Sequence, residues 1–237
     1  MWQTTVNGQV LHFHLAGINN QNFIMRDEET GSWWQQVTGE AIQGPLTGQH
    51  LSPVDYDELT FGTWKQESPQ GRVLKPNEAI ERAGQYARAD WDQRMEKVPV
   101  TTSASLDKAL PPRALIVGVT VNNASCAYPF DAVVKQSPII DDLGKTPIMI
   151  VLGDDRKSVR AFARTVDGRK LEFFVKPDTA PLRLVDAESG SEWDFSGKAV
   201  SGPATGKQLA KLSALNDYWF DWKTYNPSTA LYRLGDR

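Results

Sequence analysis

The chain has 237 residues, with 26 Lys and Arg against 29 Asp and Glu, and its sequence pI is near 5.7. This balance argues against a general nucleic-acid binder, which would present a basic face, and the lack of any run of about 18 apolar residues predicts no membrane span. Eight tryptophans beside 18 glycines and 14 prolines are typical of a turn-rich β protein packed around large aromatic side chains. The first residues do not have the pattern of a signal peptide, and a single cysteine excludes an internal disulfide.

The stretch up to residue 53 predicts short strands separated by tight turns. Asn7-Gly8 favours a two-residue hairpin, because both residue types tolerate positive φ. In the strand that follows, Leu11 and Phe13 share one face. Trp34 comes soon after an acidic turn closed by a glycine, and we expect its indole to fix that turn to the core.

Residues 78–97 predict the one substantial helix, of about 20 residues. Asn77 can cap it, and Glu78 and Glu81 in its first turn favour the helix dipole. Apolar side chains at three- to four-residue spacing predict a packed face made of Ile80, Ala83, Ala87, Trp91 and Met95. Residues 98–112 have the composition of a linker and end in two prolines.

A second β-rich region begins at residue 113. ALIVGVTVN and PIMIVL predict buried strands, AYPFDAVVKQ a short helical turn, and VRAFARTV an alternating strand. Asp167-Gly168 then predicts a hairpin like the one at Asn7-Gly8. Nothing before residue 6 corresponds to residues 113–162.

The sequence from residue 6 onward is repeated from residue 166 onward. ETGSWWQQVTGEAIQGPLTGQHL (29–51) corresponds to ESGSEWDFSGKAVSGPATGKQL (188–209), and the offset is 160 at Gly8 and 158 at Trp64. The structural repeat positions are Asp27, Gly31, Trp34, Gly44 and Trp64 in the first copy, and Asp186, Gly190, Trp193, Gly202 and Trp222 in the second. A match of this length predicts a duplicated structural unit.

We therefore predict a mainly β protein, borderline α+β, in which one helix of about 20 residues joins two related β-rich lobes. The predicted parts are 5–74, a partial first unit, then 75–112, the helix plus linker, and 113–233, a complete second unit. Either the first lobe is a half-unit that pairs with the second, or residues upstream of it have been lost.

The second unit resembles an uncharacterised bacterial family known as domain of unknown function 3179. The resemblance is carried by CAYPFDAVVKQSPIIDDLGKTPIMIV, VDGRKLEFF, VDAESGSEWDFSGKAVSGPATGKQL and WFDWKTYNPST, and RDEETGSWWQQVTGEAIQGPLTG in the first copy is similar to the family's later motifs. The resemblance implies no established activity, and it implies an extracytoplasmic setting because relatives are often exported. Many relatives have two cysteines where this chain has Gly153 and Arg156, which excludes thiolate ligation there.

His12 and His14 are candidate metal ligands, because residues two apart on a strand face the same way. Such a site would need Asp27, Glu29 or Cys126 to complete it. The alternative is that the two imidazoles only lie on a solvated face. No other cofactor is evident.

Asp27 and Asp186 precede the two matching tight turns. Paired acids beside tryptophans suggest a glycosidase or a carbohydrate binder, whereas the simpler expectation is that each aspartate accepts backbone N–H bonds within its turn. Ser32 and Ser191 lie in Gly-Ser-x-Trp and not in Gly-x-Ser-x-Gly, so no nucleophile elbow is predicted.

The sequence favours a non-catalytic binding or interaction module, with an unknown protein or glycan partner. The alternative is a metal-dependent or hydrolytic enzyme that uses His12, His14 and nearby carboxylates. A polar, open cleft between the lobes would favour a functional site, and tight apolar packing there would argue against one.

Overall fold

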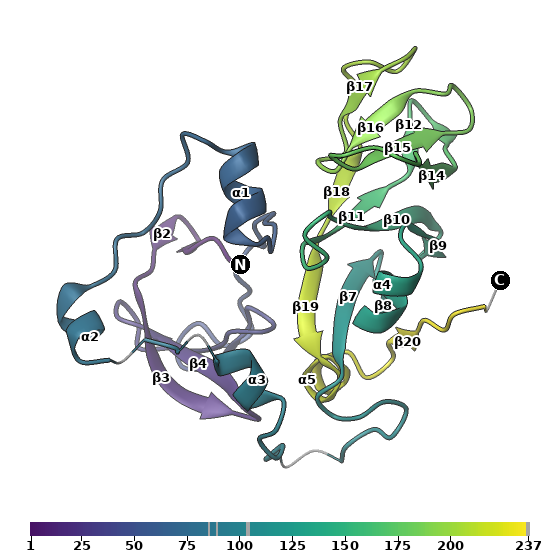
Figure 1. Ribbon diagram of the computed structural model, residues 1–237. Helices are drawn as coiled ribbons and strands as arrows, with labels where there is room; N and C mark the ends of the chain where they lie inside the picture. The colour runs from purple at the N-terminus through teal and green to yellow at the C-terminus, as the bar shows by residue number, and fades with distance from the viewer. Residues whose placement is uncertain (85, 89, 103–104, 236–237) are drawn as a thin grey trace.

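The computed structural model describes residues 1–84, 86–88, 90–102 and 105–235. Strands before residue 54 and strands after residue 114 form separate sheets, and the two groups lie side by side (Figure 1). We call the group before residue 54 the first lobe and the chain from residue 113 onward the second lobe. As predicted, the protein is mainly β. Its helices are all short in the described residues.

The first lobe consists of a short hairpin and a four-stranded antiparallel sheet. β1 (Thr5–Val6) and β2 (Gln9–Val10) pair around Asn7 and Gly8, which have φ of 50° and 81°. The sheet has the order β3 (Phe13–Asn19), β4 (Asn22–Asp27), β5 (Trp33–Gln35) and β6 (Ala41–Gln43). The core of this lobe is made of Val6, Leu11, Trp34, Ala41 and Leu51.

The second copy forms the same arrangement. β12 (Thr165–Val166) pairs with β13 (Arg169–Lys170), and the next sheet has the order β14 (Phe173–Val175), β15 (Arg183–Asp186), β16 (Glu192–Asp194) and β17 (Ala199–Ser201). In both sheets the register shifts directly before the repeated tryptophan, Trp34 or Trp193. The ring of Phe13 meets Trp34 edge-on at 5.8 Å, and that of Phe173 meets Trp193 at 5.7 Å. The two matching stretches of sequence thus have the same strand order and the same register shift beside the tryptophan.

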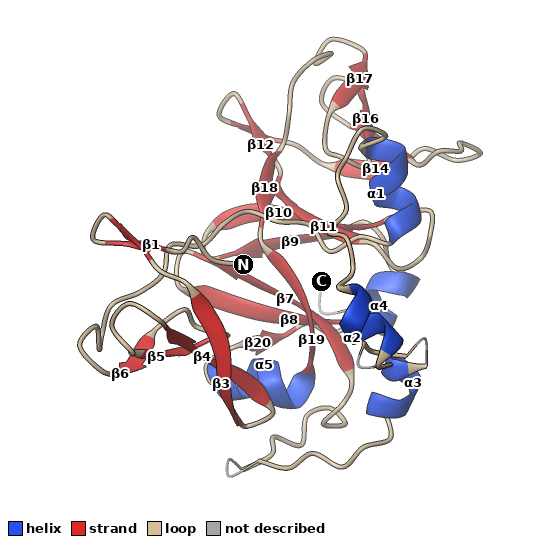
Figure 2. Ribbon diagram, turned by 90° about the vertical axis from the view of Figure 1, so that its left-hand side faces the viewer, coloured by secondary structure: helices blue, strands red, loops and turns tan. Residues whose placement is uncertain are grey.

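The second lobe has two further four-stranded sheets. The described residues of the first lobe form no counterpart of them. One has the order β19 (Ala214–Tyr218), β7 (Leu115–Val121), β8 (Ala124–Pro129) and β20 (Ala230–Leu231). The other has the order β18 (Ala210–Leu212), β11 (Val159–Ala163), β10 (Thr146–Leu152) and β9 (Ile139–Leu143) (Figure 2). α4 (Phe130–Lys135) connects β8 to β9. Apolar side chains from both sheets, such as Val117 and Ile148, meet in one buried core.

Trp2 is the counterpart of an aromatic residue in one of these sheets. It bridges to Pro53 in the antiparallel sense, as Phe162 of β11 pairs with Lys211 of β18. Each ring lies against the glycine of a repeated turn, because a Cβ on Gly39 would lie 2.9 Å from Trp2 and a Cβ on Gly197 would lie 2.6 Å from Phe162. The first residues of the chain therefore correspond to the end of β11, which corrects the expectation that nothing before residue 6 has a counterpart in residues 113–162.

Trp64 and Trp222 lie in two short helices, α1 (Phe61–Glu67) and α5 (Trp219–Tyr225). α5 packs on β7, where Gly118 leaves room for the indole of Trp222; a Cβ on Gly118 would lie 2.3 Å from the ring. α1 has no corresponding sheet in the first lobe, which it follows in the chain, and none of its residues is buried. It contacts the second lobe instead, at a place described below.

The prediction of a single helix over 78–97 is wrong. The described residues form two five-residue helices, α2 (Glu78–Arg82) and α3 (Trp91–Met95). Residues 85 and 89 of the predicted helix, and 103–104 of the predicted linker, lie outside the described residues. Asn77 caps α2 as expected, but Gly84, at φ of 63°, turns the chain out of the helix. Trp91 of the predicted apolar face is 51% exposed, and a helix without packing partners is marginal in water.

Candidate ligand-binding cleft

The repeated aspartates hold the repeated tryptophans, one pair in each lobe. Asp27 Oδ2 accepts a hydrogen bond from Trp34 Nε1 at 2.8 Å, and Asp186 Oδ2 accepts one from Trp193 Nε1 at 2.8 Å. Both carboxylates are buried, and each also accepts the backbone amide three residues later. Burial alone would raise the pKa of Asp27, but the bonds from the indole and from the turn lower it. Each aspartate therefore serves its own turn, as the simpler expectation has it.

His12 and His14 lie beside two glutamates of the acidic turn in the first lobe. His12 Nδ1 is 2.6 Å from Glu29 Oε1, and His14 Nδ1 is 4.0 Å from Glu28 Oε1. The hydrogen bond to Glu29 raises the pKa of His12, and the same bond lowers the pKa of Glu29. Among the described residues, no three His, Cys, Asp or Glu side chains are grouped as a metal site requires. A metal at His12 and His14 stays a prediction.

The serines and the cysteine are engaged in structure. Ser32 Oγ accepts the amide of Leu46 at 3.1 Å, and Ser191 Oγ accepts the amide of Ala204 at 2.9 Å. Cys126 of β8 is buried, which raises the pKa of its thiol. None of these three side chains lines the cleft between the lobes.

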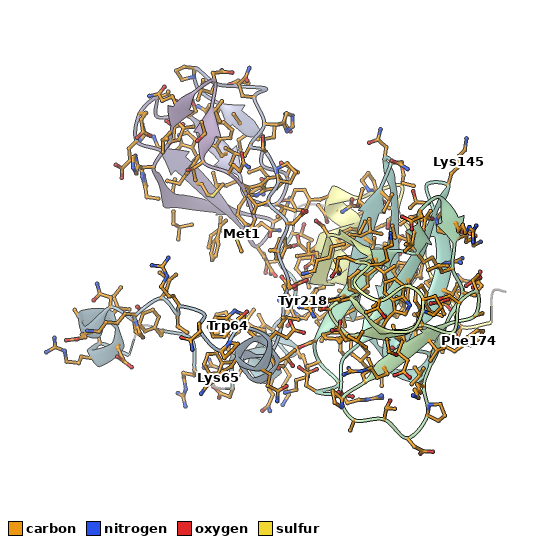
Figure 3. The ribbon with its side chains drawn as sticks, turned by 90° about the horizontal axis from the view of Figure 1, so that it is seen from above. Met1, Trp64, Lys65, Lys145, Phe174 and Tyr218 are labelled. Atoms are coloured by element: carbon orange, nitrogen blue, oxygen red, sulfur yellow. The ribbon has the colours of Figure 1, made fainter. Side chains whose placement is uncertain are left out.

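A cleft of about 400 Å³ lies between the two lobes. Met1, which lines it, and Tyr218 lie on the facing sides of the lobes (Figure 3). The cleft is lined from the first lobe and the segment after it by Met1, Trp2, Asn22, Gln36, Val37, Pro53, Val54 and Tyr56, and from the second lobe by Gly118, Thr120, Ser213, Leu215, Asn216, Asp217, Asp221, Trp222 and Asn226. This volume is within the range of small-molecule sites. The walls combine aromatic, amide and carboxyl groups, and none of the lining residues is Lys, Arg or His.

Asp217 and Asp221 form a carboxyl pair in the second-lobe wall of this cleft. Asp217 lies near the end of β19 and Asp221 lies in the first turn of α5. The two carboxyl groups are close enough for the charge of Asp221 to raise the pKa of Asp217, so the buried pair favours keeping a proton. Asn22 Nδ2 of the first lobe donates to Asp221 Oδ1, and the Tyr218 amide donates to Asp217 Oδ1 at 2.7 Å. The pair is thus held from both lobes.

Burial and mutual repulsion set the protonation of the pair. Burial, and then the charge of Asp221, raise the pKa of Asp217 to about 8, and burial also raises the pKa of Asp221. Burial raises the pKa of the nearby phenols of Tyr56 and Tyr225 as well. Near pH 7 the pair therefore keeps a proton, and a ligand that brings positive charge would favour its release.

Neither Asp217 nor Asp221 stands out in the sequence. Their counterparts in the first copy are Leu59 and Thr63, so a comparison of matching positions directs attention away from them. The available signal is the spacing of the two acids, four apart and surrounded by aromatic residues. At a boundary between a strand and a helix, that spacing can bring two side chains together.

A family model described as a protein of unknown function, DUF3179, matches residues 1–229. The chain belongs to the DUF3179 family. The match includes both copies of the repeat and all of the residues that line the cleft. No curated protein and no solved structure matches the chain. In the described part of this DUF3179 protein, no helix has the length and apolar character needed to cross a membrane.

Proposed function

We propose that this DUF3179 protein is a non-catalytic binding module that holds a small organic cation, such as an amine, between its lobes. The observation that carries the proposal is the charge of the cleft, whose side chains include the Asp217–Asp221 pair and no Lys, Arg or His, and in which burial lowers the pKa of the Met1 amino group. An ammonium group matches these walls, because it brings positive charge and N–H donors to carboxyl oxygens. A cation would also relieve the repulsion that raises the pKa of Asp217.

The aromatic walls of the cleft suit the same ligand. Trp2 is oriented by a bond from its Nε1 to the Gln36 carbonyl at 2.7 Å, and Trp222 by a bond from its Nε1 to Thr229 Oγ1 at 2.9 Å. These bonds fix the polar edges of the two indoles before any ligand arrives, so little ordering would accompany binding. An aromatic face attracts a cation, and aromatic rings also cover the apolar carbons of an organic amine.

Calorimetric titration of the full chain at pH 7 tests the proposal, with putrescine and benzylamine as cations and glucose as a neutral probe. We expect both amines to bind and glucose not to bind. We also expect amine binding to release a proton, seen as a heat that depends on the ionisation enthalpy of the buffer. Asp217→Asn and Asp221→Asn should each weaken amine binding by about tenfold or more, because each removes a partner of the buried ammonium.

The matched control is Asp167→Asn, which removes an exposed carboxylate that is paired only with Lys207 at 3.0 Å. It should leave amine affinity unchanged. The proposal fails if no amine binds, or if the two cleft variants bind amines as well as the wild type does. Preferential binding of glucose would instead favour the glycan partner that the sequence suggests.

The enzymatic alternative relies on other residues. His12 and His14 do not line the cleft. No observation favours a metal-dependent or hydrolytic reaction over binding.

A further inference from the structure

Residues 55–67, which we call the strap, follow the first lobe in the chain and lie against the second lobe. They form a segment without regular secondary structure that ends in α1. Figure 3 shows α1, marked by Trp64 and Lys65, beside the second lobe and apart from the first-lobe sheet. The sequence places these residues in the first unit, so the strap crosses from one lobe to the other.

Arg160 of β11 holds the strap through two carboxylates. Its guanidinium donates to both oxygens of Glu67 at 2.7 Å and to Asp57 Oδ2 at 2.8 Å. It lies 4.7 Å from the centroid of the Phe195 ring, and only 3% of its side chain is exposed. Lys211 of β18 donates a further bond to Asp57 at 2.5 Å. A buried, forked ion pair of this kind depends strongly on every one of its charges.

Asp155 holds the start of α1. It accepts hydrogen bonds from the hydroxyls of Thr60 at 2.6 Å and Thr63 at 2.8 Å, and the Thr60 amide donates to Ser158 Oγ at 2.9 Å. Burial would raise the pKa of Asp155, but the bonds from Ser158 and Thr60 hold this pKa well below its usual range. By contrast, Phe61 is 61% exposed and α1 has no buried residue. Charge and hydrogen bonding, more than apolar burial, therefore hold the strap in place.

Successive side chains of the strap contact different parts of the second lobe and the cleft. Tyr56 lines the cleft, and Asp57 binds Arg160. The Glu58 carboxylate accepts the amide of Asn216 at 3.0 Å, and its charge contributes to the raised pKa of Asp217. Because these three residues are consecutive, a backbone movement that takes Asp57 away from Arg160 would also move Tyr56 and Glu58.

We infer that the strap is a gate for the cleft, held shut by Arg160. When Asp57 and Glu67 leave Arg160, Tyr56 is withdrawn from the cleft wall and Glu58 from the Asn216 amide, and the second-lobe carboxyl pair becomes accessible from that side. This role in regulation rests on the proposed function, because it takes the cleft as the binding site. The gate itself can be measured without a ligand.

Hydrogen exchange measured by NMR on the full chain tests the gate, with the Asn216 amide as the reporter because it donates to the Glu58 carboxylate. In Glu67→Gln we expect the amides of α1 and of Asn216 to exchange about tenfold faster or more, and those of β10 to be unchanged. Asp57→Asn is a second variant with the same expectation. High salt should accelerate the same amides in the wild type, and Asp167→Asn should not accelerate them.

Faster exchange in α1 with an unchanged rate at Asn216 would overturn the gate, and so would unchanged rates at both places. Amine affinity is measured separately. If Asn216 exchanges faster in Glu67→Gln while the wild type binds no amine, the gate stands and the proposed ligand falls. If the wild type binds amines but Asn216 does not respond to either variant, the gate falls and the proposed function stands.

Discussion

Four aspartates show how the surroundings of a carboxyl group decide its role. Asp27 and Asp186 each accept an indole N–H and turn amides, so the ionised form is satisfied inside the protein. Asp217 and Asp221 lie buried beside each other, and their pKa values are raised, so the pair keeps a proton near pH 7. The first two carboxyl groups therefore stabilise the fold, whereas the second two cost the fold stability at neutral pH and are available to a ligand.

Replacement of Asp217 by asparagine should stabilise the free protein. In the unfolded chain this carboxyl ionises near pH 3.8, whereas in the folded protein its pKa is raised to about 8. The unfolded state thus loses its proton first, and the stability of the folded wild type falls as pH rises from about 4 to about 8. Asp217→Asn removes this titration. We expect its Tm to exceed that of the wild type most at pH 8, and the difference to shrink toward pH 4.

Thermal unfolding of both proteins between pH 4 and pH 9 measures this difference. Asp167→Asn provides the control, because its carboxylate is exposed on a hairpin turn. A difference in Tm between Asp217→Asn and the wild type that does not change with pH would contradict the assignment of a raised pKa to Asp217.

At the scale of elements, the repeated turn after β6 and β17 depends on glycine for two separate reasons. Gly44 and Gly202 have φ of 103° and 85°, and a Cβ on either would lie 2.7 Å from the Cα of a serine, Ser32 or Ser191. Gly48 and Gly206 in the same turns have φ of 83° and 86°, but a Cβ there would meet nothing within 4 Å. The first two positions are therefore both strained and crowded for alanine, whereas the second two are only strained.

This difference predicts two sizes of destabilisation. Gly48→Ala and Gly206→Ala should each cost about 1 kcal/mol, from the left-handed backbone alone. Gly44→Ala and Gly202→Ala should each cost about 3 kcal/mol, because the crowded serine backbone must also shift. Denaturant unfolding of the four variants gives the comparison. Equal costs at the crowded and open positions would show that the packing of these turns is not as described.

The sequence predicts elements well where local chemistry decides them. Asn7-Gly8 and the acidic turn before Trp34 follow from turn propensity and period, and the structure has them. Residues 78–97 have the apolar spacing of a helix, but Trp91 is about half exposed in the structure. A single sequence does not show whether a tertiary partner is present to stabilise such a helix. The sequence raises a cleft between the lobes as a possibility, but the residues that line it were missed for the same reason, since Asn22 meets Asp221 only when two distant segments come together.

For the whole molecule, the division of the apolar side chains between the two lobes determines how we expect the protein to unfold. In the described residues, the cluster around Trp34 draws only on the first lobe, and the other clusters draw only on residues from 110 onward. The contacts that join these parts include polar ones, from Asn22 of the first lobe to Asp221 of the second and from Arg160 to Glu67 of the strap. Each lobe therefore stabilises itself, and the first does so with a small core.

We therefore expect calorimetry to show two thermal transitions, with the first lobe unfolding at the lower temperature. Asp27→Ala should lower only the first transition and Asp186→Ala only the second, because each leaves one buried indole N–H of its own lobe without an acceptor. Each loss should cost about 1–3 kcal/mol. A single transition that both variants lower equally would show instead that the polar contacts through Arg160 and Asn22 couple the lobes into one cooperative unit.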